Sequence, residues 1–332
     1  MKRLIPIIFL SALLSSCEFG FEVSNNVAPG LYLGCVASPE KAVIELACAS
    51  PLGVNAADIP EVKLRELEFS VNGEILPLTD LQVDFGQTLG RPLAPGDKIG
   101  LKALAEGLPQ VEASTVQPAQ PSLDKVTLVK EEMSGVRVSG FDLYLDAQPA
   151  ADEYIGIMIR KSCEIQIEGE WKDSVRFLSP SVTAPADPAA EMARVDFFGM
   201  YLIRAVSSGR DRPAPRILTL VPASALRDGK LSLTVIDMSG IMQAGQGGAP
   251  PMAIPEPPQE RNVFYEFRIL GVSEDFYRYS LARYKSSSDF LAQMGLAPAQ
   301  FAWSNVRGGF GVCGAYTSLS YSFEETEILL DN

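Results

Sequence analysis

Residues 67–78 read LEFSVNGEILPL, and this stretch decides the fold class. Apolar and polar side chains alternate before Asn72-Gly73, and this dipeptide is the strongest short-range signal of a β-hairpin. A two-residue turn there places Phe69 opposite Leu76, so apolar side chains meet across the two strands. The agreement between turn chemistry and side-chain pattern predicts an antiparallel sheet.

The same two-residue period continues along the chain on both sides of this hairpin. A slip at Arg65-Glu66 within the first strand is typical of a β-bulge. Short alternating runs between Gly, Pro and Asp turns are typical of antiparallel sandwiches, and a βαβ rhythm is missing from the pattern. We therefore expect a mainly β chain of tandem antiparallel β-sandwich domains. Later alternating runs are Val126–Val129, Phe141–Leu145, Ile155–Ile159, Cys163–Ile167, Ile217–Val221, Leu231–Val235, Val263–Leu270 and Val312–Phe323.

Proline and glycine mark the divisions of the chain. Pro118 and Pro121 end the first block of strands, because proline cannot donate the hydrogen bond that a central strand needs. Eight Gly or Pro residues between Gly245 and Pro258 leave little to bury and predict a mobile loop. The expected parts are a signal peptide (1–16), a lipidated tether (17–29), an N-terminal β-domain (30–117), a Pro-containing linker (118–125) and a C-terminal β-sandwich domain (126–332) with a mobile loop at 240–260 and a helix at 274–294.

One segment has the helical period instead of the strand period. Ser273 can cap it, Glu274 and Asp275 suit the positive N-terminal end of the helix dipole, and Gly295 can take the left-handed position after it. An apolar face at helical spacing predicts packing against a sheet, with a ligand platform as the alternative. The residues on that face are Tyr277, Leu281, Tyr284 and Leu291.

Composition excludes several classes of function. The chain has 332 residues, with 28 basic and 41 acidic side chains and a net charge of −13. This balance, without a long basic run, argues against nucleic-acid binding. There is no histidine, which removes Ser-His-Asp and Cys-His catalysis, histidine-ligated zinc and proximal-His haem. We expect no cofactor and no bound metal.

The first residues have the order of a secretory signal peptide. Lys2 and Arg3 precede an apolar run that is too short to remain in a bilayer as a spanning helix. The run ends in Leu14-Ser-Ser-Cys17, which resembles the bacterial lipobox. This resemblance implies that Cys17 becomes the lipidated N-terminus of an anchored protein, and a secreted protein with an unmodified cysteine is the alternative.

The remaining cysteines are expected to form disulfides. Four cysteines in an exported chain allow three connectivities. We favour Cys35–Cys48 and Cys163–Cys313, one bridge within each expected domain. A tight turn at Pro39-Glu40 would not place Cys35 opposite Cys48, so that bridge needs a longer loop or strands that are not direct neighbours. Free buried thiols are the alternative.

The C-terminal quarter carries a specific pattern. Asp275-Phe-Tyr-Arg-Tyr279 opens the expected helix, and residues 303–316 follow with WSNVRGGFGVCGAY. This order resembles the ending of a lipoprotein family of Bacteroidota catalogued as domain of unknown function 4249. The resemblance implies an outer-membrane lipoprotein with an N-terminal Ig-like or transthyretin-like β-domain, often encoded beside TonB-dependent transporters. No activity is established for that family, so it implies no catalytic residues, and Cys313 stands where the family usually has Phe.

The anchor and the resemblance together give the functional expectation. We expect a non-enzymatic outer-membrane lipoprotein, exposed on the cell surface, that assists a TonB-dependent transporter in nutrient capture through loops at the end of the second domain. Glu18 and Glu22 follow Cys17 with no basic residue before Lys41, which resembles the surface-export signal of Bacteroidota lipoproteins. A structural or adhesive surface protein is the second alternative, and a carboxylate-based hydrolase is the third.

Acidic pairs are the candidates for a hydrolytic or calcium site. Asp142/Asp146 and Asp152/Glu153 lie at the ends of expected strands. Two carboxylates can bind calcium or hydrolyse a glycoside, but strand-end carboxylates are commonly only solvated. The stretch Asn305–Gly314 is rich in glycine, as phosphate-binding loops are. It is followed by an expected strand rather than a helix, so it favours close backbone packing over phosphate binding.

Overall fold

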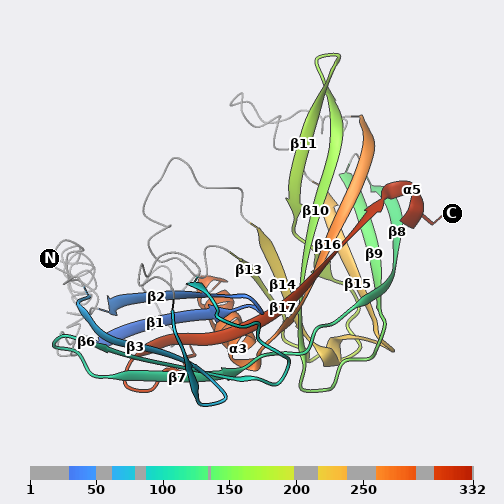
Figure 1. The fold of residues 1–332 in the computed structure, drawn as a ribbon. Helices are drawn as coiled ribbons and strands as arrows, with labels where there is room; N and C mark the ends of the chain where they lie inside the picture. Colours follow the sequence, from blue (N-terminus) through green and yellow to red (C-terminus); the bar gives the residue numbers. More distant parts are fainter. Residues whose placement is uncertain are drawn as a thin grey trace, which may run out of the picture.

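The computed structural model describes seven segments of the chain, and they form a mainly β protein (Figure 1). The signal peptide, Cys17, the tether and most of the loop expected at 240–260 lie outside these segments, so those expectations stay predictions. Among the described residues, no helix is long and apolar enough to cross a membrane. The described segments are residues 30–49, 62–78, 87–133, 136–197, 216–237, 259–288 and 303–330.

The largest sheet joins strands from both ends of the chain. Its hydrogen-bonded order is β13-β14-β10-β16-β17-β1-β2-β5, and β11 pairs with the outer part of β10. Its strands are β1 (Gly30–Ala37), β2 (Lys41–Ala49), β5 (Gln87–Thr88), β10 (Tyr154–Ile167), β11 (Glu170–Leu178), β13 (Ala193–Asp196), β14 (Ile217–Pro222), β16 (Glu260–Val272) and β17 (Phe310–Glu324).

Two four-stranded sheets face this large sheet. The first has the order β4-β3-β6-β7, and the second has the order β12-β15-β9-β8. Their strands are β3 (Leu64–Val71), β4 (Glu74–Leu76), β6 (Lys98–Ala105), β7 (Val111–Val116), β8 (Leu123–Met133), β9 (Val136–Leu145), β12 (Ser181–Val182) and β15 (Lys230–Asp237). Two α-helices, α3 (Glu274–Ser288) and the short α5 (Glu325–Ile328), and the 3-10 helix η3 (Ala223–Ala225) complete the described elements.

The hairpin that opened the sequence argument is confirmed. Asn72 and Gly73 have φ angles of 54° and 85°, the left-handed values that a type I′ turn requires. Phe69 pairs with Leu76, where β4 ends. The expected bulge is present as a register shift in β3 after Leu64. Local turn chemistry therefore sets the register of this sheet.

Strand β17 changes its pairing partner along its length. Phe310–Ala315 pair in parallel with β1, and Tyr316–Glu324 pair antiparallel with β16. Figure 1 shows β17 as one long strand that passes through both halves of the molecule. The parallel β1–β17 pair differs from the predicted antiparallel sheets. Parallel strands need a long connection, and β1 and β17 have one because they come from opposite ends of the chain. The expected domains 30–117 and 126–332 thus share one sheet.

Two hydrophobic cores pack against the two parts of the shared sheet. The first lies between β1-β2 and the β4-β3-β6-β7 sheet, with Phe69 fully buried in it. The second lies between β10-β16-β17 and the β12-β15-β9-β8 sheet. In this second core the ring of Phe141 lies edge-on to Tyr265 at 5.2 Å and to Phe267 at 5.4 Å between centroids. Burial of each side chain of this size stabilises the fold by about 1.5–3 kcal/mol. Because each core lies between two facing sheets, the β-sandwich prediction is confirmed.

Helix α3 begins as the sequence predicts and packs on β17. Ser273 Oγ accepts a hydrogen bond from the backbone N–H of Phe276 at 3.3 Å and another from Ala315 N at 3.0 Å. The cap therefore also fixes the helix start to β17. A Cβ on Gly314 would lie 2.9 Å from the Cβ of Phe276, so glycine allows this contact. Residues 289–294 of the expected helix lie outside the described segments.

The structure corrects the favoured disulfides, because all four described cysteines are free thiols. Cys35 and Cys48 lie four positions apart along the paired strands β1 and β2. That separation is about 13 Å along a strand, whereas a bridge needs Cα atoms within about 7 Å. Cys163 lies in the second core, while Cys313 lies in the first core directly opposite Cys35. The neighbouring Cys35 thiol and burial raise the pKa of the Cys313 thiol well above its usual value, so it is a poor nucleophile.

A buried ion-pair cluster lies in the second core. Glu260 Oε2 is 2.6 Å from Lys161 Nζ, and its Oε1 is 2.6 Å from Arg176 Nη2. The side chains of Lys161 and Glu260 are each only 6% exposed. Removing one partner of such a pair leaves an uncompensated buried charge, which costs more than the pair itself contributes.

Gly311 should tolerate no side chain. Its φ is 121°, and an added Cβ would lie 2.0 Å from the carbonyl oxygen of Leu33 in β1. We expect G311A to lower the free energy of unfolding by about 3 kcal/mol, measured by urea denaturation. The matched control is G90A, since nothing lies within 4 Å of a Cβ at Gly90. The control should stay within about 0.5 kcal/mol of wild type, and equal effects of the two variants would contradict the close β1–β17 contact.

Lys161 should be essential for the stability of the second core. We expect K161M to reduce the free energy of unfolding by about 3–5 kcal/mol, because Glu260 then stays buried with less compensation. R65M is the control, since Arg65 pairs with Glu106 at 2.9 Å with side chains 62% and 53% exposed. Loss of an exposed pair costs about 0–1 kcal/mol. Similar denaturation midpoints for K161M and R65M would show that the buried cluster is not structural.

Candidate functional site

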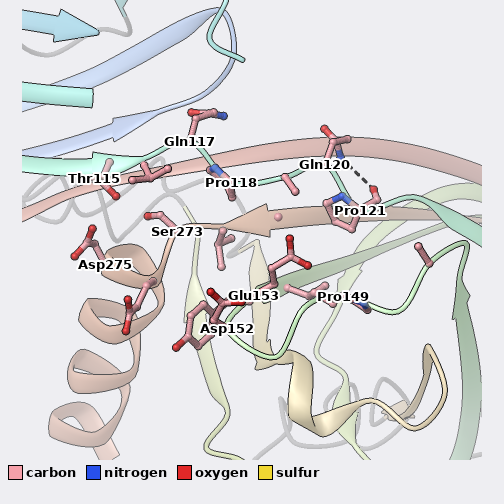
Figure 2. A pocket seen from close by; sticks show the side chains of 18 of the residues that line it. Thr115, Gln117, Pro118, Gln120, Pro121, Pro149, Asp152, Glu153, Ser273 and Asp275 are labelled. Carbon is pink, nitrogen blue, oxygen red and sulfur yellow. Dashed lines mark hydrogen bonds between the residues drawn. The ribbon is translucent and has the colours of Figure 1, made fainter. Parts of the chain in front are cut away.

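A cleft of about 590 Å³ opens where the two sandwiches meet (Figure 2). Three segments that are distant in the sequence line it. They are Thr115–Ser122 at the end of β7 and before β8, residues from Ala147 to Ile155 ahead of and within β10, and Gly271–Asp275 at the junction of β16 and α3. This volume lies within the range of about 300–1,000 Å³ that is typical of small-molecule sites.

The first segment is fixed to β17 by hydrogen bonds. Gln117 Nε2 donates to the carbonyl oxygen of Tyr316 at 3.0 Å, and Thr317 Oγ1 donates to the carbonyl oxygen of Ala119 at 2.8 Å. The linker also crosses directly over β16, since a Cβ on Gly271 would lie 2.0 Å from the same Ala119 oxygen. The glycine at position 271 therefore allows the linker to form one wall of the cleft.

The second segment is a tight turn that carries two carboxylates. The backbone N–H of Ala150 donates to Glu153 Oε2 at 2.7 Å, and the N–H of Glu153 donates to the carbonyl oxygen of Ala150 at 2.9 Å. Asp152 is exposed beside it. Tyr154 follows, and its ring stacks on Tyr277 of α3 with centroids 4.3 Å apart. This stacking joins the turn to the helix across the base of the site.

The third segment brings two more carboxylates to the start of α3. Glu274 forms an ion pair with Arg278 at 2.5 Å, one helical turn later. Asp275 is half-buried, and burial raises the pKa of its carboxyl group. Figure 2 shows Asp275 at the helix start and Asp152 and Glu153 on the loop that faces it.

The cleft is strongly acidic. Asp152, Glu153, Glu274 and Asp275 line it, and its lining contains no lysine or arginine among the described residues. The chain as a whole is also acidic, with a net charge of −13. The arrangement suits hydrogen-bond donors and positive groups, and it repels anions.

The sequence identified only part of this site. The structure places Asp152 and Glu153 in the cleft, but it pairs Asp142 with Lys230 at 2.7 Å and binds Asp146 to Ser122. The described residues contain no cluster of three or more acidic or cysteine side chains that could hold a metal ion. The cysteines of the expected bridges lie away from the cleft lining, and Cys17 lies outside the described segments.

The sequence predicts other roles for two residues that line the cleft, Asp275 and Gln117. From the sequence, Asp275 is expected only as a favourable charge at a helix start, and Gln117 only as the last residue of the N-terminal β-domain. Their place in one cleft depends on the contact between the linker and β17, a contact for which the sequence carries no local signal. The candidate site lies at the junction of the two sandwiches, and capture by loops at the end of the second domain stays a prediction.

Comparison with known proteins gives one family. A family model described as "Domain of unknown function (DUF4249)" matches residues 18–322. No curated protein matches the chain. A solved structure described as "Complete structure of manganese lipoxygenase of Gaeumannomyces graminis and partial structure of zonadhesin of Komagataella pastoris" is 8% identical, covering 91% of this chain and 85% of that chain. Its TM-score of 0.18 is too low to carry an argument on fold or function.

Asp275 and Asp97 should make opposite contributions to the pH dependence of stability. Because the folded pKa of Asp275 is raised, its contribution is largest below the unfolded pKa of about 3.9 and is lost as the pH rises through the folded value. The backbone N–H of Ala94 and the side chain of Asn72 lower the pKa of Asp97, so its contribution is present above about 3.9 and is lost as the pH falls.

The two neutral variants D275N and D97N measure these slopes. The free energy of unfolding of wild type minus that of D275N should fall as the pH rises above about 4. The same difference for D97N should rise with pH below about 4 and then level off. Urea denaturation across this range gives both curves, and slopes of the same sign would contradict the buried environment of Asp275.

Proposed function

The chain belongs to the family catalogued as domain of unknown function 4249, and we propose that it is a non-enzymatic, surface-exposed lipoprotein of the outer membrane that captures a small molecule for a TonB-dependent transporter. The observation that carries this proposal is the cleft of about 590 Å³ at the junction of the two sandwiches. Residues from both sandwiches line it, so a ligand in the cleft would contact both parts of the molecule at once.

The sequence before β1 supports the anchor. Cys17 follows an apolar run and a Leu-Ser-Ser triplet, and the tether of residues 17–29 ends where β1 begins at Gly30. Cleavage before Cys17 removes Lys2 and Arg3, so the mature chain is even more acidic than the −13 of the full sequence. Such a surface is not attracted to anionic lipids, and acyl chains on Cys17 would provide the membrane attachment.

The build of the cleft favours holding a ligand. Its walls are backbone carbonyls, prolines and carboxylates that are fixed by hydrogen bonds to β17 and by the Tyr154–Tyr277 stack. Segments that are held in place by such contacts lose little conformational entropy when a ligand binds, which strengthens capture. Delivery to a transporter then requires only that the cleft face the partner barrel, which the lipid tether permits.

The carboxylates also favour a second candidate, a carboxylate-based hydrolase. Asp275 has a raised pKa, as a general acid requires, and Asp152 is an exposed carboxylate in the same cleft that suits a general base. Release of nitrophenol from a nitrophenyl glycoside by the wild-type protein, lost in D275N, would favour this hydrolase over capture.

The anchoring and partner proposals have one experiment in common. Mild crosslinking of intact cells, followed by purification of the chain from outer membranes, should recover a β-barrel transporter that mass spectrometry can identify. C17A should leave the membrane fraction and lose the crosslinked barrel, because it carries no lipid. C48A is the matched control, since Cys48 is one of the free thiols of the described residues, and it should behave as wild type.

Two outcomes would contradict these proposals. Recovery of the wild-type protein alone from membranes would contradict the proposed transporter partner. Retention of C17A in the membrane fraction would contradict the proposed lipid anchor. Protease added to sealed cells should digest the protein if it faces outward, and full protection would place it on the inner side of the outer membrane.

A further inference from the structure

We propose that Cys35 and Cys313 close into a disulfide as the exported chain folds, and that this bridge joins β1 covalently to β17. The structure holds both residues as free thiols, and it places Cys48 and Cys163 too far away for the two bridges that the sequence favoured. The new pair rests on the proposed function for its compartment only, because stable disulfides form in chains that leave the cytoplasm.

The two cysteines lie directly opposite each other in the parallel ladder between β1 and β17. Neighbouring strands are about 4.8 Å apart, which lies within the range of about 4.4–6.8 Å between Cα atoms that a disulfide needs. Opposite residues of paired strands place their side chains on the same face of the sheet. Both cysteines are 0% exposed and belong to the first hydrophobic core, so their thiols enter the same enclosed space.

The register that brings the thiols together is fixed on both outer edges of the pair. On one side, Cys35 pairs with Ile44 of β2. On the other side, Asn305 Nδ2 donates to the carbonyl oxygen of Cys313 at 2.8 Å, and the N–H of Cys313 donates to Asn305 Oδ1 at 2.9 Å. A slip of one residue would turn one thiol to the opposite face of the sheet, and these contacts oppose such a slip.

The surroundings of the pair decide when the bridge can form. The Cys35 thiol and burial raise the pKa of the Cys313 thiol, which therefore stays protonated in the folded chain. Exchange with an external oxidant needs a thiolate that the oxidant can reach. The bridge must therefore close during folding, before the first core covers the two strands.

The bond forms by exchange with a disulfide oxidant, either oxidised glutathione or the active-site disulfide of a thiol–disulfide oxidoreductase. The thiolate of one cysteine attacks the oxidant, which gives a mixed disulfide and releases one oxidant thiol. The thiolate of the second cysteine attacks the sulfur of the first and releases the second oxidant thiol. Two electrons and two protons thus pass from the pair to the oxidant, and one S–S bond replaces another.

The bridge would strengthen the junction on which both sandwiches depend. Strand β1 directly follows the tether, and β17 continues from its pair with β1 into its pair with β16 (Figure 1). A pull through the lipid-anchored tether enters the fold at β1. A covalent bond to β17 keeps the tether joined to both sandwiches when the hydrogen bonds between the two strands open.

The other two described cysteines provide matched controls. Cys48 lies opposite Leu31, four positions from Cys35 along β1, and Cys163 lies opposite Ser174 in the second core. Neither of them lies opposite another cysteine in the described ladders. The variants C48A and C163A therefore remove one thiol each and should leave the proposed bridge in place.

Mass-spectrometric mapping of the full chain tests the bridge in two samples. The first sample is denatured, reduced and refolded in detergent with reduced and oxidised glutathione. The second is taken from the outer membranes of intact cells, with iodoacetamide present from lysis onward. Both digests should contain the peptides of Cys35 and Cys313 joined by a disulfide, while Cys48 and Cys163 are alkylated.

The thermal midpoint gives a second measurement that depends on the same bond. Wild-type protein refolded with a reductant should have a Tm about 5–10 °C below that of protein refolded with glutathione, because a bridge across a long loop restricts the unfolded chain. C163A should show the same difference, and C313A should show none. A difference that persists in C313A would overturn the bridge.

The two samples separate this inference from the function on which it rests. Alkylated Cys35 and Cys313 in the refolded sample would overturn the bridge wherever the protein is located, and so would a link from either residue to Cys48 or Cys163. A bridge in the refolded sample with free thiols in the cellular sample would support the pairing and contradict export, and with it the proposed function. A bridge in both samples supports both proposals.

Discussion

The pairing of β17 with two different partners is the constraint on which the rest of the structure depends. Its first part pairs in parallel with β1, and its second part pairs antiparallel with β16. One extended strand therefore belongs to both sandwiches and fixes them to each other. The parallel part requires Gly311, where the backbone of β1 leaves no room for a Cβ, and α3 packs over the same strand at Gly314. A side chain at position 311 would push β17 away from β1, and a side chain at position 314 would push α3 away from β17.

The position of the cleft follows from this change of partner. The strand passes from β1 to β16 between Ala315 and Tyr316, and the linker is hydrogen-bonded there through Tyr316 and Thr317. The cap of α3 is bound to Ala315 at the same place. Three segments consequently meet where neither sandwich alone closes the surface. Ligand sites commonly form where a sheet changes its connectivity, because side chains and loops diverge there and leave a crevice.

Electrostatics gives this crevice its chemical character. Several acidic side chains elsewhere in the described chain have basic partners, most closely Glu260 with Lys161 and Arg176 in the buried cluster. In the cleft the carboxylates of Asp152 and Asp275 face the cavity, and burial has already raised the pKa of the second. Ionisable groups with perturbed pKa values in a cleft are often found at functional sites.

The sequence by itself determined what depends on residues a few positions apart. The two-residue period set the mainly β class, Asn72-Gly73 set a hairpin register, and Ser273 set the start of a helix, because each acts on its neighbours. Tertiary structure alone decided the β1–β17 pair, the separation of the cysteines and the cleft. The hydrogen bond from Gln117 to Tyr316 joins residues 199 positions apart, and no local pattern selects one such partner among many. Alternation could place Cys163 and Cys313 in a core, but it could not show that the chain has two cores, because that depends on which strands β17 pairs with.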